Sequence, residues 1–155
     1  MIAELQHGEE HAEGVGALAP RRLEFVRPLV GFAEITGFEL RSLGVDYEPY
    51  ARLVARGGSG LEFIVVPPGA LFPDYVFEIP DEIVALLGVE DADSVEVYVL
   101  VTGGGASTPT VNLMGPLVRN RANGRGAQLV LQDDRYGVAV PVDAGRAQAA
   151  GGVLD

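Results

Sequence analysis

Several chemically useful residue types are absent or scarce in this 155-residue chain. It has no cysteine, which excludes disulfides, thiolate metal ligands and cysteine catalysis. It also has no lysine, since all 11 basic residues are arginine, so a Schiff-base lysine and a Walker-type phosphate loop are excluded. Both histidines, His7 and His11, precede residue 20, which leaves no histidine base for a Ser-His-Asp arrangement inside the fold. We therefore expect a non-enzymatic binding protein with no cofactor.

Long apolar runs and a signal peptide are missing as well. No apolar run approaches the length needed to span a membrane, and the first residues carry acids where a signal peptide carries bases. A chain without cysteine also fits a reducing compartment. These features predict a cytoplasmic protein that does not bind membranes.

The charge of the chain is strongly negative. It has 22 acidic and 11 basic residues, for a formal net charge of −11. This charge disfavours direct nucleic-acid binding, because attraction to phosphates supplies most of that affinity. It could attract a basic protein partner, although charge alone is better explained by solubility. The acid pairs Asp91/Asp93 and Asp133/Asp134 lie in turn contexts, where aspartate caps backbone N–H groups.

Composition divides the chain into one domain and two tails. Residues 1–20 are rich in Ala, Gly and Glu and predict a flexible N-terminal tail, and residues 143–155 predict a flexible C-terminal tail. Residues 21–142 predict a single β domain. His7 and His11 are four residues apart, but the residue after His7 is Gly8, where a metalloprotease helix carries Glu. We therefore expect no metal site.

Alternating apolar and polar residues predict a mostly β fold. The run at 61–66 is almost continuously apolar, which is typical of a strand covered on both sides. One short helix is expected at 80–87, with Pro80 at its first position and Gly88 as its left-handed cap. Short strands with frequent turns predict an antiparallel small barrel or sandwich. The expected strands are residues 23–26, 38–41, 47–55, 61–66, 95–102 and 136–141.

The aromatic segment from Leu71 to Phe77 allows two interpretations. Clustered aromatic residues usually pack, so this segment is expected to cover one end of the barrel. Alternatively, it is exposed. It then either presents aromatic surface to a partner or lines a pocket at the barrel mouth, in which case the protein is a small β-barrel that binds a small-molecule ligand.

The stretch from Thr110 to Leu131 contains a predicted hairpin. Asn123-Gly124 separates the strand-forming runs 117–120 and 128–131, and this dipeptide favours a type I′ turn with positive φ at both positions. Pro116 cannot donate to a ladder and is expected at a strand start, an edge or a bulge. Asn112 is a polar residue in an apolar segment and needs hydrogen-bond partners wherever it is buried.

The hairpin region resembles a known family. Residues 110–120, TVNLMGPLVRN, are similar to the signature Thr-Ala-Asn-Leu-Leu-Ala-Pro-Ile-Val-Ile-Asn of the bacterial flagellar assembly factor FliW, and residues 126–131, GAQLVL, resemble the Gly-x-Gln-Val-Val-Leu that follows it. Gly31-Phe32 and Pro73-Asp74-Tyr75 support the match, which covers most of the predicted domain. Arg119 departs from the signature, because it replaces an aliphatic residue.

The resemblance implies a function. Members of this family are non-enzymatic cytoplasmic proteins with two competing partners: flagellin, held in a chaperone-like complex before export, and the RNA-binding translational regulator CsrA, whose repression of flagellin synthesis is relieved on binding. The resemblance therefore implies a chain that binds these two proteins, and we expect it to be a monomer when free.

The signature is also the candidate partner-binding site. We expect four apolar residues at or near a sheet edge, rimmed by two asparagines. Asn120→Ala is expected to weaken binding with little change in stability, whereas Asn112 is expected to have a structural role; the alternative is that both asparagines cap backbone groups of the hairpin. The candidate residues are Asn112, Leu113, Pro116, Leu117, Val118 and Asn120.

Overall fold

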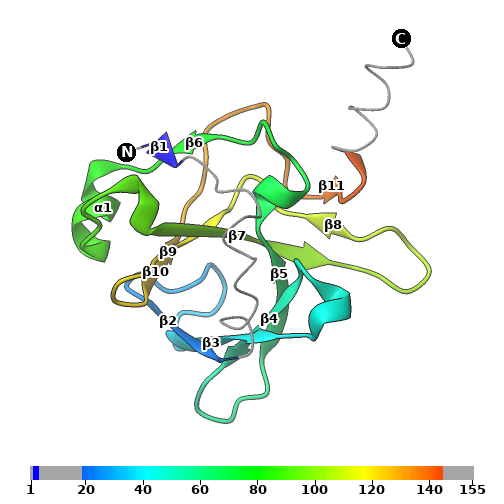
Figure 1. Ribbon diagram of the computed structural model, residues 1–155, viewed down its shortest axis with the longest axis horizontal. Helices are drawn as coiled ribbons and strands as arrows, with labels where there is room; N and C mark the ends of the chain where they lie inside the picture. Colours follow the sequence, from blue (N-terminus) through cyan, green and yellow to red (C-terminus); the bar gives the residue numbers. More distant parts are fainter. Residues whose placement is uncertain (1, 4–18, 145–155) are drawn as a thin grey trace.

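The computed structural model describes residues 2–3 and 19–144, which form a closed β-barrel with one α-helix packed against its outside (Figure 1). Every neighbouring pair of barrel strands is antiparallel except β10 with β2, and these two strands close the ring. In their order around the barrel, the seven strands are β2 (Arg21–Phe25), β3 (Gly37–Ser42), β4 (Ala51–Ala55), β5 (Glu62–Val66), β7 (Val95–Thr102), β9 (Leu117–Asn120) and β10 (Arg125–Gln128).

The remaining elements lie outside the ring. Helix α1 (Asp81–Leu87) packs beside β10. Strand β8 (Thr110–Val111) extends the sheet from the far end of β7 and pairs in turn with β11 (Val140–Pro141). A separate two-stranded sheet joins β1 (Ile2–Ala3) to β6 (Phe77–Glu78). Short 3₁₀ helices are η2 (Val45–Tyr47), η3 (Pro68–Ala70) and η4 (Ala92–Ser94).

Large apolar side chains fill the barrel interior. Leu23, Phe38, Leu53 and Val65 are completely buried there, because alternate residues of each strand point inward. The rings of Phe25 and Phe38 meet edge to face, with their centroids 5.4 Å apart. Because side chains fill the interior, the structure argues against a barrel that binds a small-molecule ligand inside it.

A second core lies on the outer face of β7, β9 and β10. Val97 and Val99 of β7 point outward, and Val118 and Ala127 of the neighbouring strands join them. Ile83 and Leu87 of α1 are buried against this face with the segment that follows η3. Strand β7 therefore contacts a core on each of its two faces.

The structure confirms the mostly β barrel and refines the boundaries of its strands. Helix α1 begins at Asp81, so Pro80 is its N-cap rather than its first helical residue, and Gly88 ends it with φ +71° as expected. The second strand of the hairpin is Arg125–Gln128, earlier than the predicted 128–131. Within the predicted run 136–141, only Val140–Pro141 is a strand.

The aromatic segment packs, but not where either interpretation placed it. Tyr75 and Phe77 are buried in the outer core rather than over a barrel end or around a barrel mouth. The ring of Tyr75 lies edge to face on Tyr136, with 4.7 Å between centroids. An open depression of about 340 Å³ lies beside this segment, on the outside of the barrel; its lining residues are Val76, Phe77, Glu78, Leu131, Gln132, Asp133 and Arg135.

Most of the two predicted tails lies outside the described residues, including His7 and His11. Ile2–Ala3, in the predicted N-terminal tail, pairs with β6. Over residues 2–3 and 19–144, no helix is long and apolar enough to cross a membrane.

Candidate functional site

The predicted hairpin is present, but its turn is not type I′. Strands β9 and β10 pair with Val118 opposite Ala127. Four residues, 121–124, connect them, and the carbonyl of Asn120 accepts hydrogen bonds from the N–H groups of Gly124 at 2.7 Å and Asn123 at 3.3 Å. Gly124 has φ +78°, whereas no described residue other than glycine has a positive φ, Asn123 included. The longer loop needs one left-handed residue rather than two.

The expectation that the signature lies at a sheet edge is wrong. Strand β9 pairs with β10 on one side and with β7 on the other, so no edge of β9 is open. Its residues alternate between the two cores, with Leu117 inside the barrel and Val118 in the outer core. The exposed fractions of the candidate residues are 4% for Leu113, 1% for Leu117, 0% for Val118 and 1% for Asn120, and Pro116 is also buried.

The residues before β9 are held by the outer core. Pro116 stands immediately before the strand, as expected, and its carbonyl accepts from the N–H of Leu129 at 2.9 Å. The hydroxyl of Tyr75 donates to the carbonyl of Leu113 at 2.6 Å. Burial, and to a lesser degree the neighbouring Tyr136, raises the pKa of Tyr75, so this hydroxyl keeps its proton.

Asn120 joins the hairpin to the helix. Its side-chain NH₂ donates to the carbonyl of Leu87, the last residue of α1, at 2.8 Å, and its side-chain oxygen accepts from the N–H of Ala122 at 2.9 Å. Asn123 donates to the same Leu87 carbonyl at 3.0 Å. The final carbonyls of a helix lack hydrogen-bond donors within the helix. The two hairpin asparagines therefore supply the donors for the Leu87 carbonyl. These contacts correspond to the capping alternative for Asn120.

Asn112 has the structural contacts expected of it. It is half-buried, and its side-chain oxygen accepts from the N–H groups of Met114 at 3.1 Å and Gly115 at 3.0 Å. The amide of Gln128 donates to the carbonyl of Gly115 at 3.1 Å, and its oxygen accepts from the N–H of Val30 at 3.3 Å. These bonds fix the turn that leads into β9.

A polar group at one end of the barrel interior was not anticipated. Glu96 of β7 points inward with a 12% exposed side chain and accepts from three arginines: Arg21 at 2.8 Å, Arg119 at 3.0 Å and Arg121 at 3.2 Å. Arg21 also donates to the hydroxyl of Tyr98, which donates to Glu96 at 3.2 Å. Two more exposed arginines lie at the same end of the barrel: Arg22, next to Arg21 in β2, and Arg125, the first residue of β10. We call these five residues the arginine cluster: Arg21, Arg22, Arg119, Arg121 and Arg125.

The arginines determine the charge of Glu96. Burial by itself would raise the pKa of Glu96, but the positive charges of Arg21, Arg119 and Arg121 outweigh it and hold that pKa below its usual value. Burial, and then the Glu96 carboxylate, raises the pKa of Tyr98 to about 12. Glu96 is therefore ionised and Tyr98 protonated at neutral pH.

Comparison with known proteins identifies the family. The family model described as FliW protein matches residues 9–142 of this chain. The chain belongs to the FliW family.

Curated relatives agree with this assignment. The flagellar assembly factor FliW of Treponema denticola is 34% identical over 115 residues, which is 74% of this chain and 77% of that protein. The FliW proteins of Caldanaerobacter subterraneus and Bacillus subtilis are 30% and 31% identical over 119 residues, covering 76% of this chain and 79% and 82% of those proteins.

A solved structure confirms the fold. The crystal structure of a flagellar assembly factor FliW superimposes with a TM-score of 0.71 over 89% of both chains at 23% identity. Against the FliW signature given above, Arg119 is the departure that the geometry explains, since it lies opposite Glu96 in the β7–β9 register and is 8% exposed. Alternation with Tyr98 could have placed Glu96 on the inward face, but its arginine partners come from strands whose register the sequence does not reveal.

Proposed function

We propose that this chain is a non-enzymatic flagellar assembly factor with two protein partners. It would hold flagellin in a chaperone-like complex before export, and it would bind the translational regulator CsrA and so relieve repression of flagellin synthesis. The match of the FliW family model to residues 9–142 carries this proposal. The names of the curated relatives, all flagellar assembly factors, support it.

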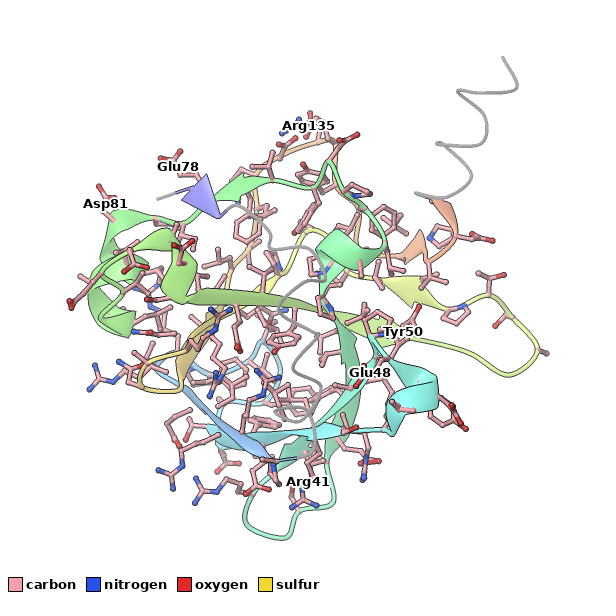
Figure 2. The ribbon with its side chains drawn as sticks, viewed as in Figure 1. Arg41, Glu48, Tyr50, Glu78, Asp81 and Arg135 are labelled. Carbon is pink, nitrogen blue, oxygen red and sulfur yellow. The ribbon has the colours of Figure 1, made fainter. Side chains whose placement is uncertain are left out.

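The charge distribution supports a basic partner. Between residues 78 and 91 the chain has five exposed acids and no arginine: Glu78, Asp81, Glu82, Glu90 and Asp91. They precede, begin and follow α1, and Figure 2 shows Glu78 and Asp81 on the same side of the molecule. Such a surface would speed association with a basic RNA-binding protein and orient it through complementary charge.

Most of the signature residues would support the partner-binding surface from inside the protein. Because Leu117, Val118 and Asn120 are buried, they would position α1 and the hairpin rather than contact a partner. Asn112 and Met114 are the half-buried residues of the signature's turn, and Val130 beyond β10 is 61% exposed. We propose that any direct contact in this region involves these three residues.

The test is binding to both proteins from the source organism, measured by calorimetry with the full chain. We expect dissociation constants of about 1 µM or lower. Neutralising three acids, Glu78→Gln, Asp81→Asn and Glu90→Gln, should weaken CsrA binding.

The matched control neutralises Glu34, Asp46 and Glu48, which are also exposed. Figure 2 shows Glu48 well away from Glu78 and Asp81. Both variants change the net charge equally. Equal weakening of CsrA binding by the two variants would mean that net charge, and not the acids around α1, causes the effect. Absence of binding to flagellin and to CsrA at micromolar concentration would refute the proposed function.

A further inference from the structure

The arginine cluster lies at one end of the barrel, although its residues come from two separate stretches of the chain. Arg21 and Arg22 begin β2, Arg119 lies in β9, and Arg121 and Arg125 flank the hairpin turn. The Nε of Arg119 donates to the backbone carbonyl of Arg22 at 2.8 Å, which links β9 to β2 although β10 lies between these strands in the sheet. Almost half of the 11 arginines of this acidic chain therefore lie at one end of the barrel.

This cluster has more positive charge than its one buried acid balances. Glu96 is shared by three guanidinium groups, of which Arg119 is 8% exposed, Arg21 37% and Arg121 48%. Among the residues that the structure describes, no carboxylate lies within ion-pair distance of Arg22 or Arg125, and both are exposed.

Part of the donor capacity is also unused. A guanidinium has five N–H donors. Arg121 uses Nε on Glu96 at 3.2 Å and Nη1 on the carbonyl of Asp93 at 2.8 Å. Its Nη2 makes no hydrogen bond with a residue in the described ranges, and Arg125 makes one long side-chain bond, to the carbonyl of Leu86 at 3.4 Å. Glu96 fixes the buried side of the cluster, and the outer side can donate to an incoming anion.

We propose that the arginine cluster binds a short acidic segment, rich in Asp or Glu, of a partner protein. Arginine holds carboxylates through paired, charge-assisted hydrogen bonds. Charges are screened beyond about 8 Å at physiological salt, so the net charge of −11 does not prevent a local contact at this end. A nucleic acid is disfavoured, because its continuous row of phosphates would extend past the cluster onto acidic surface. This inference does not depend on which proteins the proposed function names.

The experiment measures fluorescence anisotropy of a labelled hexaglutamate peptide titrated with the full chain at low salt. A Gly-Ser peptide of equal length is the peptide control. We expect saturable binding of hexaglutamate only, weakening as salt rises. The double variant Arg121→Ala/Arg125→Ala should weaken it about tenfold or more, since hydrogen bonds to charged groups contribute substantially to affinity.

Arg135→Ala/Arg27→Ala is the matched control, with the same change in charge at two exposed arginines outside the cluster. Arg135 lies with Glu78 at the depression beside β6, and Figure 2 shows both residues at the top of the view. Melting temperatures of both doubles verify folding. Absence of hexaglutamate binding up to about 1 mM, or equal weakening by the two doubles, would overturn the proposal. Tighter binding of a labelled oligothymidine at the same arginines would overturn it in favour of nucleic acid.

Discussion

The two halves of the barrel wall have opposite outer faces. On β7, β9 and β10 the outward residues are mostly apolar, and α1 and the segment around Tyr75 cover them. On β2 to β5 the outward residues include charged pairs such as Arg41 with Glu39 and Arg52 with Glu62. Both halves share the filled interior. A strand in a barrel is therefore apolar on one face by default, and apolar on both only where another layer covers it.

The comparison explains why the signature is buried. Its strand, β9, lies in the covered half, so one set of its side chains faces the interior and the other set faces the cover. The same pattern of apolar residues with Pro116 predicts a sheet edge open to a partner. Hydrophobicity and an adjacent proline are compatible with both settings, and closure of the ring between β7 and β9 decides between them.

The largest effect is expected from removing the contact between α1 and the covered half. Ile83→Ala should lower the free energy of unfolding by about 2–4 kcal/mol, because Ile83 is 3% exposed in the outer core. Leu86→Ala, in the same helix but 41% exposed, should cost less than about 1 kcal/mol. Chemical denaturation measures both. Equal costs would mean that α1 does not depend on its buried face.

Asn120→Ala should lower stability by about 1–3 kcal/mol, since it removes one of the two side-chain donors to the Leu87 carbonyl and the side-chain acceptor of the Ala122 N–H. This replaces the sequence-based expectation of little change in stability. Asn112→Ala should cost about 1 kcal/mol, because its bonds are to a half-exposed turn. Melting temperature and partner affinity should be measured on both variants. An Asn120→Ala protein of unchanged stability and weakened affinity would restore the binding role.

Glu96→Gln should lower stability by about 1–2 kcal/mol at pH 7, because it leaves three arginines without their shared carboxylate. The pKa of Glu96 is lower in the folded protein than in the unfolded chain, so its contribution is present above the unfolded value of about 4.3 and is lost as pH falls through the folded value. Denaturation at several pH values should show the two proteins converging in acid. A difference independent of pH would argue against the charge of Glu96 as its cause.

The smallest effect is expected on the half of the barrel wall that no layer covers, strands β2 to β5. Arg52→Ala should change stability by no more than about 0.5 kcal/mol, because its ion pair with Glu62 joins side chains that are 36% and 43% exposed. Denaturant midpoints compared with those of Ile83→Ala test the contrast directly. A cost comparable to that of Ile83→Ala would remove the distinction between the two halves.

Much of the fold could be predicted from local pattern, and the candidate site could not. The run 95–102 is the strand β7 (Val95–Thr102), and Gly88 caps α1 in the left-handed conformation. Asp91 accepts from the N–H of Ser94, as its turn context predicted. These features depend on neighbours within a few residues. The turn type failed because Asn123-Gly124 favours a two-residue turn only when the flanking strands end beside it.

By itself, the amino-acid sequence determined the elements of this protein: short alternating strands, one capped helix, a hairpin centred near Gly124, and a family signature around Asn112 and Asn120. It also excluded disulfides, thiolate metal ligands and a Schiff-base lysine, because the chain has no cysteine and no lysine. Only the tertiary structure decided which faces were covered, that Asn120 caps α1, and that three arginines meet at Glu96. Those contacts join residues from 23 to 75 positions apart, and such pairings follow from strand register and barrel closure, which local pattern does not encode.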